Sequence, residues 1–160
     1  MSSPEERLGE LLRAKGLTVA VAESCTGGLI ASRITDIAGA SDYFLAGLVT
    51  YSNAAKASFL HVPEAILAAK GAVSAETAGK MAEGVRGAAG ADIGLSVTGI
   101  AGPGGGTPEK PVGTVYMGLA AKDGVYVRHY ALAGDRLSIK RQSADRALAF
   151  ALDYLEGRPL

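Results

Sequence analysis

Hydrophobic and polar residues alternate along this chain in blocks that separate strands from helices. Several short apolar runs hold almost no charged residue, which predicts strands buried on both faces. Between these runs apolar residues recur at helical spacing, as Ile30, Ile34 and Ile37 do. Strands that alternate with helices predict an α/β fold. The apolar runs cover residues 17–22, 43–51 and 92–98.

Capping residues predict where the helices begin and end. Ser3-Pro4-Glu5-Glu6 combines a Ser cap, a Pro at the first helical position and a Glu that completes a capping box. This helix should run to about Lys15 and stop at Gly16. The last helix should reach about Glu156. The other predicted helix starts are Ser52-Asn53, Pro63, Ser74 and Asp135.

An antiparallel hairpin is predicted toward the carboxyl end, because two apolar segments flank the turn sequence Lys122-Asp123-Gly124. The segments cover residues 112–120 and 125–131. Together with the alternating strands and helices, this hairpin predicts a three-layer α/β/α fold whose mixed sheet carries helices on both faces. The length of 160 residues suits a single domain over residues 1–160.

Composition narrows the class of protein. Lys+Arg and Asp+Glu both number 16, so no general electrostatic field attracts nucleic acid or an acidic membrane, and we expect neither as a partner. The single cysteine, Cys25, excludes an internal disulfide, and His61 and His129 lie too far apart in sequence to indicate a metal site. The first residues do not resemble a signal peptide, and no apolar run reaches membrane-spanning length. We therefore expect a cytoplasmic protein that needs no metal or cofactor.

Ser24 lies where the first apolar strand turns into a helix opened by Thr26, Gly27 and Gly28. This position exposes a side chain at the carboxyl edge of a sheet, where open α/β folds bind ligands, and it directs free N–H groups to the same place. Taken alone, the segment favours a Ser that only caps the helix. Cys25 is a rival nucleophile, although no histidine is near it in sequence.

Lys56 is predicted in the first turn of a helix capped by Asn53. Asn53 is also a candidate substrate-binding residue, as are Thr26, Gly27 and Gly28. The positive end of the helix dipole and burial would both lower the pKa of this lysine, as a general base requires. A solvated surface lysine is the alternative. Tyr51 directly precedes the helix, and its side chain could bond to Ser24 or Lys56 or be an ordinary strand aromatic.

A loop rich in glycine and proline follows the third apolar run, between Thr98 and Thr107. Such a loop can direct successive N–H groups inward and bind a phosphate, but it can also be a flexible connection. It matches neither a Walker A loop nor a dinucleotide fingerprint. The candidate substrate-binding residues of this loop are Thr98, Gly99, Gly102, Gly104 and Gly105.

Arg141 is predicted to face inward from the last helix. It falls between Leu137 and Ala144 on an apolar stripe that continues through Leu148 and Leu155. A buried arginine needs an anionic partner, which could be a substrate phosphate or an internal carboxylate.

Taken together, these segments resemble the C-terminal domain of the competence/damage-inducible protein CinA, over nearly the whole chain and in the same order. The matching segments are Val19–Gly28, Tyr51–Asn53 with Lys56, Gly71–Ala78 and Val97–Gly105.

The resemblance implies a nicotinamide-nucleotide amidohydrolase, which converts nicotinamide mononucleotide to nicotinic acid mononucleotide and ammonia in pyridine nucleotide recycling. It implies a serine–lysine pair, Ser24 and Lys56, with Tyr51 nearby, and substrate contacts from Thr98 and Arg141. It also implies a homo-oligomer. Longer relatives carry an N-terminal pyrophosphatase domain, for which this chain has no room.

Two alternatives stay open at this point. The domain could be a binding module for phosphoribosyl ligands with little turnover, serving a competence or DNA-damage role. It could also be an amidase that uses Cys25 as its nucleophile.

Overall fold

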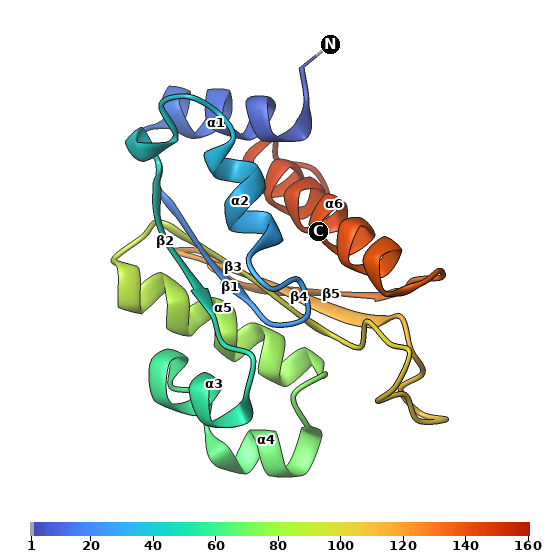
Figure 1. Cartoon of the computed structure of the whole chain (residues 1–160). Helices are drawn as coiled ribbons and strands as arrows, with labels where there is room; N and C mark the ends of the chain where they lie inside the picture. Colours follow the sequence, from blue (N-terminus) through green and yellow to red (C-terminus); the bar gives the residue numbers. More distant parts are fainter. Residues whose placement is uncertain (1) are drawn as a thin grey trace.

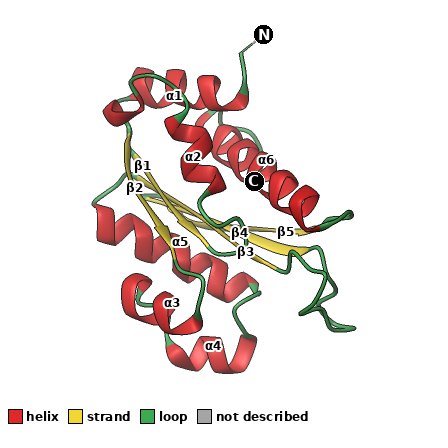
Figure 2. Ribbon diagram, viewed as in Figure 1, coloured by secondary structure: helices red, strands yellow, loops and turns green. Residues whose placement is uncertain are grey.

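Residues 2–160 are described by a computed structural model, in which a mixed sheet lies between helices on both faces (Figures 1 and 2). The strands are β1 (Val19–Glu23), β2 (Phe44–Val49), β3 (Ile93–Gly99), β4 (Thr114–Ala121) and β5 (Gly124–Ala131). The helices are α1 (Pro4–Lys15), α2 (Leu29–Thr35), α3 (Asn53–Leu60), α4 (Glu64–Lys70), α5 (Ala75–Ala89) and α6 (Arg136–Leu155), with a short 3-10 turn η1 (Ala40–Asp42).

The strand order β2-β1-β3-β4-β5 places the parallel strands on one side of the sheet and the hairpin on the other. Strands β1, β2 and β3 are parallel, whereas β4 pairs antiparallel with both β3 and β5. Helices α1, α2 and α6 cover one face and α5 covers the other, with α3 and α4 packed against α5 (Figure 1). The predicted three-layer α/β/α fold with a mixed sheet and a hairpin is therefore confirmed.

Burial along the strands follows their place in the sheet. Strand β1 is buried at every position and β3 at nearly every one, which explains their largely apolar sequence. Strand β2 lies at the edge, where its residues alternate between half-buried and exposed. None of the helices within residues 2–160 is long and apolar enough to cross a membrane.

Most of the predicted helix ends are confirmed. The Ser3 hydroxyl accepts from the Glu6 N–H, the Glu6 carboxylate accepts from the Ser3 N–H, and Gly16 ends α1 with φ of 65°. The hydroxyl of Ser74 caps α5 and the carboxylate of Asp135 caps α6. For α3 the cap is Ser52, whose hydroxyl accepts from the Ala55 N–H, and the predicted cap Asn53 is instead the first residue of the helix.

The prediction that Arg141 faces inward is wrong, because the buried stripe of α6 follows other residues. Arg141 is exposed and Leu137 is 57% exposed, since Leu137 lies in the first turn, beyond the core. Arg141 is two positions after the buried Ile139, which places it about 200° around the helix from that residue. The buried residues of α6 are Ile139, Ser143, Ala144, Ala147, Leu148, Phe150, Ala151 and Leu155.

Candidate active site

Three segments that are distant in sequence meet where the parallel strands end. Ser24 follows β1, Thr50 and Tyr51 follow β2, and Thr98 lies near the end of β3. Because β1 lies between β2 and β3, its end is flanked by both of the others. The connection from β1 to β2 contains α2 on one face, whereas the connection from β2 to β3 contains α5 on the other (Figure 1). Open α/β sheets bind ligands in the crevice that this reversal creates.

Ser24 and Lys56 are in direct contact inside the protein. The Lys56 Nζ lies 2.9 Å from the Ser24 Oγ, and it donates to the main-chain oxygens of Thr50 at 2.8 Å and Tyr51 at 3.3 Å. Lys56 is 1% exposed and Ser24 is 8% exposed. An ammonium can donate to all three neighbours of Nζ, whereas a neutral amine can donate to the two carbonyls and accept from the serine hydroxyl.

The surroundings of Lys56 favour its neutral form. Burial lowers the pKa of this amine below its ordinary value of 10.5. Lys56 also lies in the first turn of α3, where the helix dipole disfavours a positive charge. The side chain is therefore suited to accept a proton from Ser24.

The turn between β1 and α2 directly follows Ser24 and contains backbone donors that are not used in the described part of the chain. Gly27 and Gly28 adopt φ of 60° and 103°, which other residues rarely do, and the Gly27 N–H returns to the Ser24 carbonyl at 3.1 Å. The N–H groups of Thr26 and Gly28 have no acceptor within residues 2–160. The Thr26 hydroxyl is buried and has no hydrogen-bond partner within residues 2–160. The predicted substrate-binding residues Thr26, Gly27 and Gly28 follow Ser24 closely in sequence, but they do not line the cavity at Ser24.

A cavity of about 200 Å³ opens over the Ser24–Lys56 contact. Its lining combines a hydroxyl, an amine, small residues and one guanidinium. It is smaller than the ~300–1,000 Å³ of typical ligand pockets, so it can enclose only part of a nucleotide. Its lining residues are Ser24, Cys25, Tyr51, Lys56, Ala72, Val73, Thr98, Gly99, Ala101 and Arg136.

Thr98 and Tyr51 line this cavity in different ways. The Thr98 hydroxyl donates to the Ala72 carbonyl at 2.8 Å and so holds the segment before α5 against the site. The Tyr51 hydroxyl accepts from Arg136 at 3.0 Å and is bonded to neither Ser24 nor Lys56. Tyr51 therefore contacts the base through its main-chain carbonyl, while its ring is 61% exposed at the mouth.

Several predicted substrate-binding residues lie away from the cavity. Asn53 is exposed and lines a separate groove between α3 and α4. Gly104 and Gly105 are exposed in the loop that precedes β4, and Gly102 contributes only its carbonyl, which accepts from Arg136 at 2.6 Å. Of the predicted loop residues, Thr98 and Gly99 line the cavity.

Arg136 is the functional candidate that the sequence pattern missed. It is the first residue of α6 and links the Gly102 carbonyl to the Tyr51 hydroxyl across the mouth of the cavity. Lys140, one turn later, has its Nζ 3.7 Å from where a Cβ on Gly27 would be. Arg141 does not line this cavity. The sequence signal that could have identified Arg136 was the predicted cap at Asp135, because this cap places Arg136 at the start of the helix.

Cys25 is poorly suited to act as a nucleophile. Burial raises the pKa of its thiol to about 11, and the carboxylate of Glu23 acts in the same direction. A thiol with such a pKa holds little of the reactive thiolate near neutral pH.

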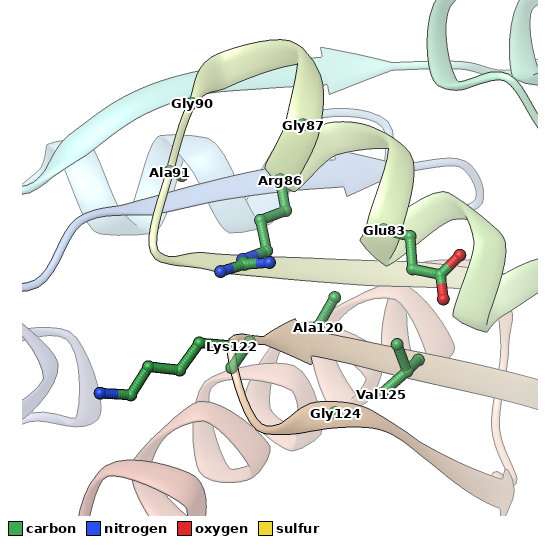
Figure 3. A pocket seen from close by; sticks show the side chains of 10 residues that line it. Glu83, Arg86, Gly87, Gly90, Ala91, Ala120, Lys122, Gly124 and Val125 are labelled. Carbon is green, nitrogen blue, oxygen red and sulfur yellow. The ribbon is translucent and has the colours of Figure 1, made fainter.

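A larger cavity, of about 540 Å³, lies at the opposite end of the sheet (Figure 3). Its charged residues are Glu83 and Arg86 on α5 and Lys122 on the hairpin turn. The Arg86 Nε is already bonded to the Asp92 carbonyl at 2.9 Å. This cavity contains no nucleophile beside a base, so the smaller cavity at Ser24 is the candidate active site.

This chain is similar to known proteins in both sequence and fold. A CinA-like protein from Geobacter sulfurreducens is 57% identical over 153 residues, which are 96% of this chain and 36% of the relative. The chain thus spans about a third of the length of such relatives. A CinA superfamily structure from Klebsiella pneumoniae superposes with a TM-score of 0.92 at 31% identity, covering 98% of this chain and 99% of that one. The competence/damage inducible protein CihA from Agrobacterium tumefaciens gives a TM-score of 0.86 at 40% identity, with 98% of each chain covered. The family model described as CinA C-terminal domain matches residues 1–155, and the chain belongs to this family.

Proposed function

We propose that this domain hydrolyses the carboxamide of nicotinamide mononucleotide, with Ser24 as nucleophile and Lys56 as general base. The observation that carries the proposal is the 2.9 Å contact between the Ser24 Oγ and the Lys56 Nζ, two buried side chains that line the cavity. A nucleophile bonded to a base of lowered pKa is the arrangement of covalent catalysis. The resemblance of the motifs around both residues to nicotinamide-nucleotide amidohydrolases supports the choice of substrate.

The proposed reaction has two steps. Neutral Lys56 takes the proton of the Ser24 hydroxyl while the Ser24 Oγ attacks the amide carbon. Donors in the turn, the N–H groups of Thr26 and Gly28, stabilise the oxyanion. The Lys56 ammonium then gives its proton to the departing nitrogen, and ammonia leaves. Water then attacks the ester on Ser24 while Lys56 takes its proton. Lys56 returns that proton to the departing Ser24 Oγ, and nicotinic acid mononucleotide is released.

The phosphate of the substrate would lie outside the cavity, at its mouth. The cavity of about 200 Å³ encloses the reacting end of the molecule, so the ribose phosphate extends past Tyr51 toward the start of α6. Arg136 and Lys140 supply positive charge there. Binding energy from a remote phosphate contributes to orientation of the amide.

The test is release of ammonia from nicotinamide mononucleotide by the purified chain in the presence of a chelator. Stoichiometric formation of nicotinic acid mononucleotide is expected, and a Ser24→Ala sample prepared in parallel excludes a contaminating amidase. Saturable binding of the nucleotide without ammonia would favour a binding module instead.

A further inference from the structure

We propose that Glu23 is a positioning residue, which holds the Ser24 hydroxyl in place against Lys56. The inference rests on the proposed role of Ser24 as nucleophile. Glu23 is the last residue of β1 and directly precedes Ser24. It is 0% exposed, and burial of a carboxylate is unfavourable unless specific donors satisfy its oxygens.

The Glu23 carboxylate crosses the turn and binds the helix that follows. One oxygen accepts from the Ile30 N–H at 2.9 Å and the other from the Ala31 N–H at 3.0 Å. The cap residue of α2 is Gly28, which has no side chain for this task. The Glu23 carboxylate thus takes the place of a cap side chain, and it connects the end of β1 to the first turn of α2.

The main chain of Glu23 is attached to the base as well. Its carbonyl accepts from the Thr50 N–H at 2.9 Å, and the Thr50 carbonyl accepts from the Lys56 Nζ at 2.8 Å. The adjacent Ser24 N–H donates to the Val97 carbonyl at 3.0 Å. Glu23 therefore fixes the base through its backbone and the nucleophile turn through its side chain.

The Glu23 side chain is needed because the turn between β1 and α2 can adopt many backbone conformations. Gly27 and Gly28 give it little conformational restraint, and Cys25 and Thr26 must hold their places beside Ser24. A misplacement of about 1 Å in a catalytic group can reduce the rate about a hundredfold. The effect of the carboxylate should therefore fall on reactivity of Ser24 and not only on stability.

Glu23→Gln is the informative variant, with Ile34→Val as its matched control. Glutamine has the same shape, but it keeps one acceptor oxygen and turns an NH2 group toward the second backbone N–H. Ile34 is a buried residue of α2, the helix that the Glu23 carboxylate binds. Shortening the Ile34 side chain loosens the packing of α2 while the carboxylate contacts stay intact.

Reactivity is measured by labelling Ser24 with an alkyl fluorophosphonate, followed by intact mass. The Ser24 Oγ forms a bond to phosphorus, the P–F bond breaks, fluoride leaves, and the hydroxyl proton passes to Lys56. We expect Glu23→Gln to label about ten- to a hundredfold more slowly, and Ile34→Val to label as fast as the unaltered protein. With nicotinamide mononucleotide, kcat should fall in parallel while KM changes little.

Equal labelling rates for Glu23→Gln and the unaltered protein would overturn the inference. A Glu23→Gln chain that does not fold by circular dichroism would also overturn it, because the carboxylate would then maintain the fold. If Ser24 of the unaltered protein is not labelled, the inference and the proposed nucleophile fall together. If it is labelled but no ammonia is released from nicotinamide mononucleotide, the proposed function fails alone and the labelling rates still decide the role of Glu23.

Discussion

At the scale of single residues, the site depends on a lysine kept where its charge is disfavoured. Lys56 is buried, lies in the first turn of a helix, and has two carbonyls and one hydroxyl as neighbours of its Nζ. Each of these features is consistent with a neutral amine that can accept a proton from Ser24. Two predictions concern this pair.

Replacement of the nucleophile should remove turnover and leave the fold intact. Ser24→Ala deletes one hydroxyl, and loss of a nucleophile of this kind reduces kcat by about a thousandfold or more. Cys25→Ala should keep most of the activity, because its thiol is held protonated by burial. Ammonia release and thermal melting are measured for both variants. Activity that survives Ser24→Ala but not Cys25→Ala would transfer the nucleophile to Cys25.

The pH dependence of the reaction should follow the lowered pKa of Lys56. Base catalysis needs the neutral amine, so kcat/KM should be low in acid, rise as pH increases through that pKa, and level off below pH 10.5. Lys56→Arg should be inactive at every pH tested, because a guanidinium stays protonated. The profile is measured with nicotinamide mononucleotide. A rise centred at or above the ordinary lysine pKa would contradict the proposed neutral base.

At the scale of elements, the start of α6 decides which arginine faces the site. The cap at Asp135 places Arg136 in the first helical position, beside Tyr51 and the Gly102 carbonyl. The middle of the same helix packs its apolar residues onto the sheet and turns Arg141 to solvent. The first turn of α6 thus places the Arg136 guanidinium at the mouth of the cavity, whereas the middle of α6 does not contribute a cation there.

Arg136→Lys should be costly although it keeps the charge, because lysine cannot hold two partners in the planar geometry of a guanidinium. Loss of a charged hydrogen bond of about 1.5–3 kcal/mol corresponds to roughly a ten- to hundredfold drop in kcat/KM. Nicotinamide riboside lacks the phosphate, so its turnover should be almost unaffected by the substitution.

The matched control for this comparison is Arg141→Lys, at an exposed position of the same helix. Its kinetics with both substrates should equal those of the unaltered protein. An equal fractional loss on the two substrates for Arg136→Lys would mean that Arg136 maintains the loop and not the phosphate contact.

At the scale of the whole molecule, α5 approaches β3 and β4 very closely. The Ser96 hydroxyl donates to the Ala78 carbonyl at 2.6 Å, and Gly118 faces the same carbonyl. A Cβ on Gly118 would lie 2.3 Å from the Ala78 oxygen. The layers can pack at this distance only where a side chain is absent.

Gly118→Ala should therefore destabilise the fold, by about 1–3 kcal/mol in the free energy of unfolding. Gly87→Ala is the control, since a Cβ there meets nothing within 4 Å and the residue lies inside α5. This second variant should stabilise the protein by about 0.5–1 kcal/mol, because alanine favours a helix interior over glycine. Chemical denaturation of both variants measures the difference. Equal stability for the two would show that the layers can separate without cost.

The sequence by itself determined the features that depend on neighbouring residues. Helix caps, apolar runs and the hairpin turn act over a few positions, so α1, α5 and the β4–β5 hairpin could be predicted from local physics. The position of Ser24 at a strand end and that of Lys56 in a first helical turn follow from the same rules. These rules locate the candidate pair along the chain but not its distance in space.

Only the tertiary structure decided which distant groups meet. The strand order places the ends of β2 and β3 on either side of β1, and this brings the Lys56 Nζ to 2.9 Å from the Ser24 Oγ. The packing of α6 on the sheet exposes Arg141 and leaves Arg136 at the cavity. Burial of Glu23 against two N–H groups of α2 depends on the same packing. These contacts join residues that are far apart in sequence and meet only when the helices pack on the sheet. A local sequence pattern therefore cannot specify them.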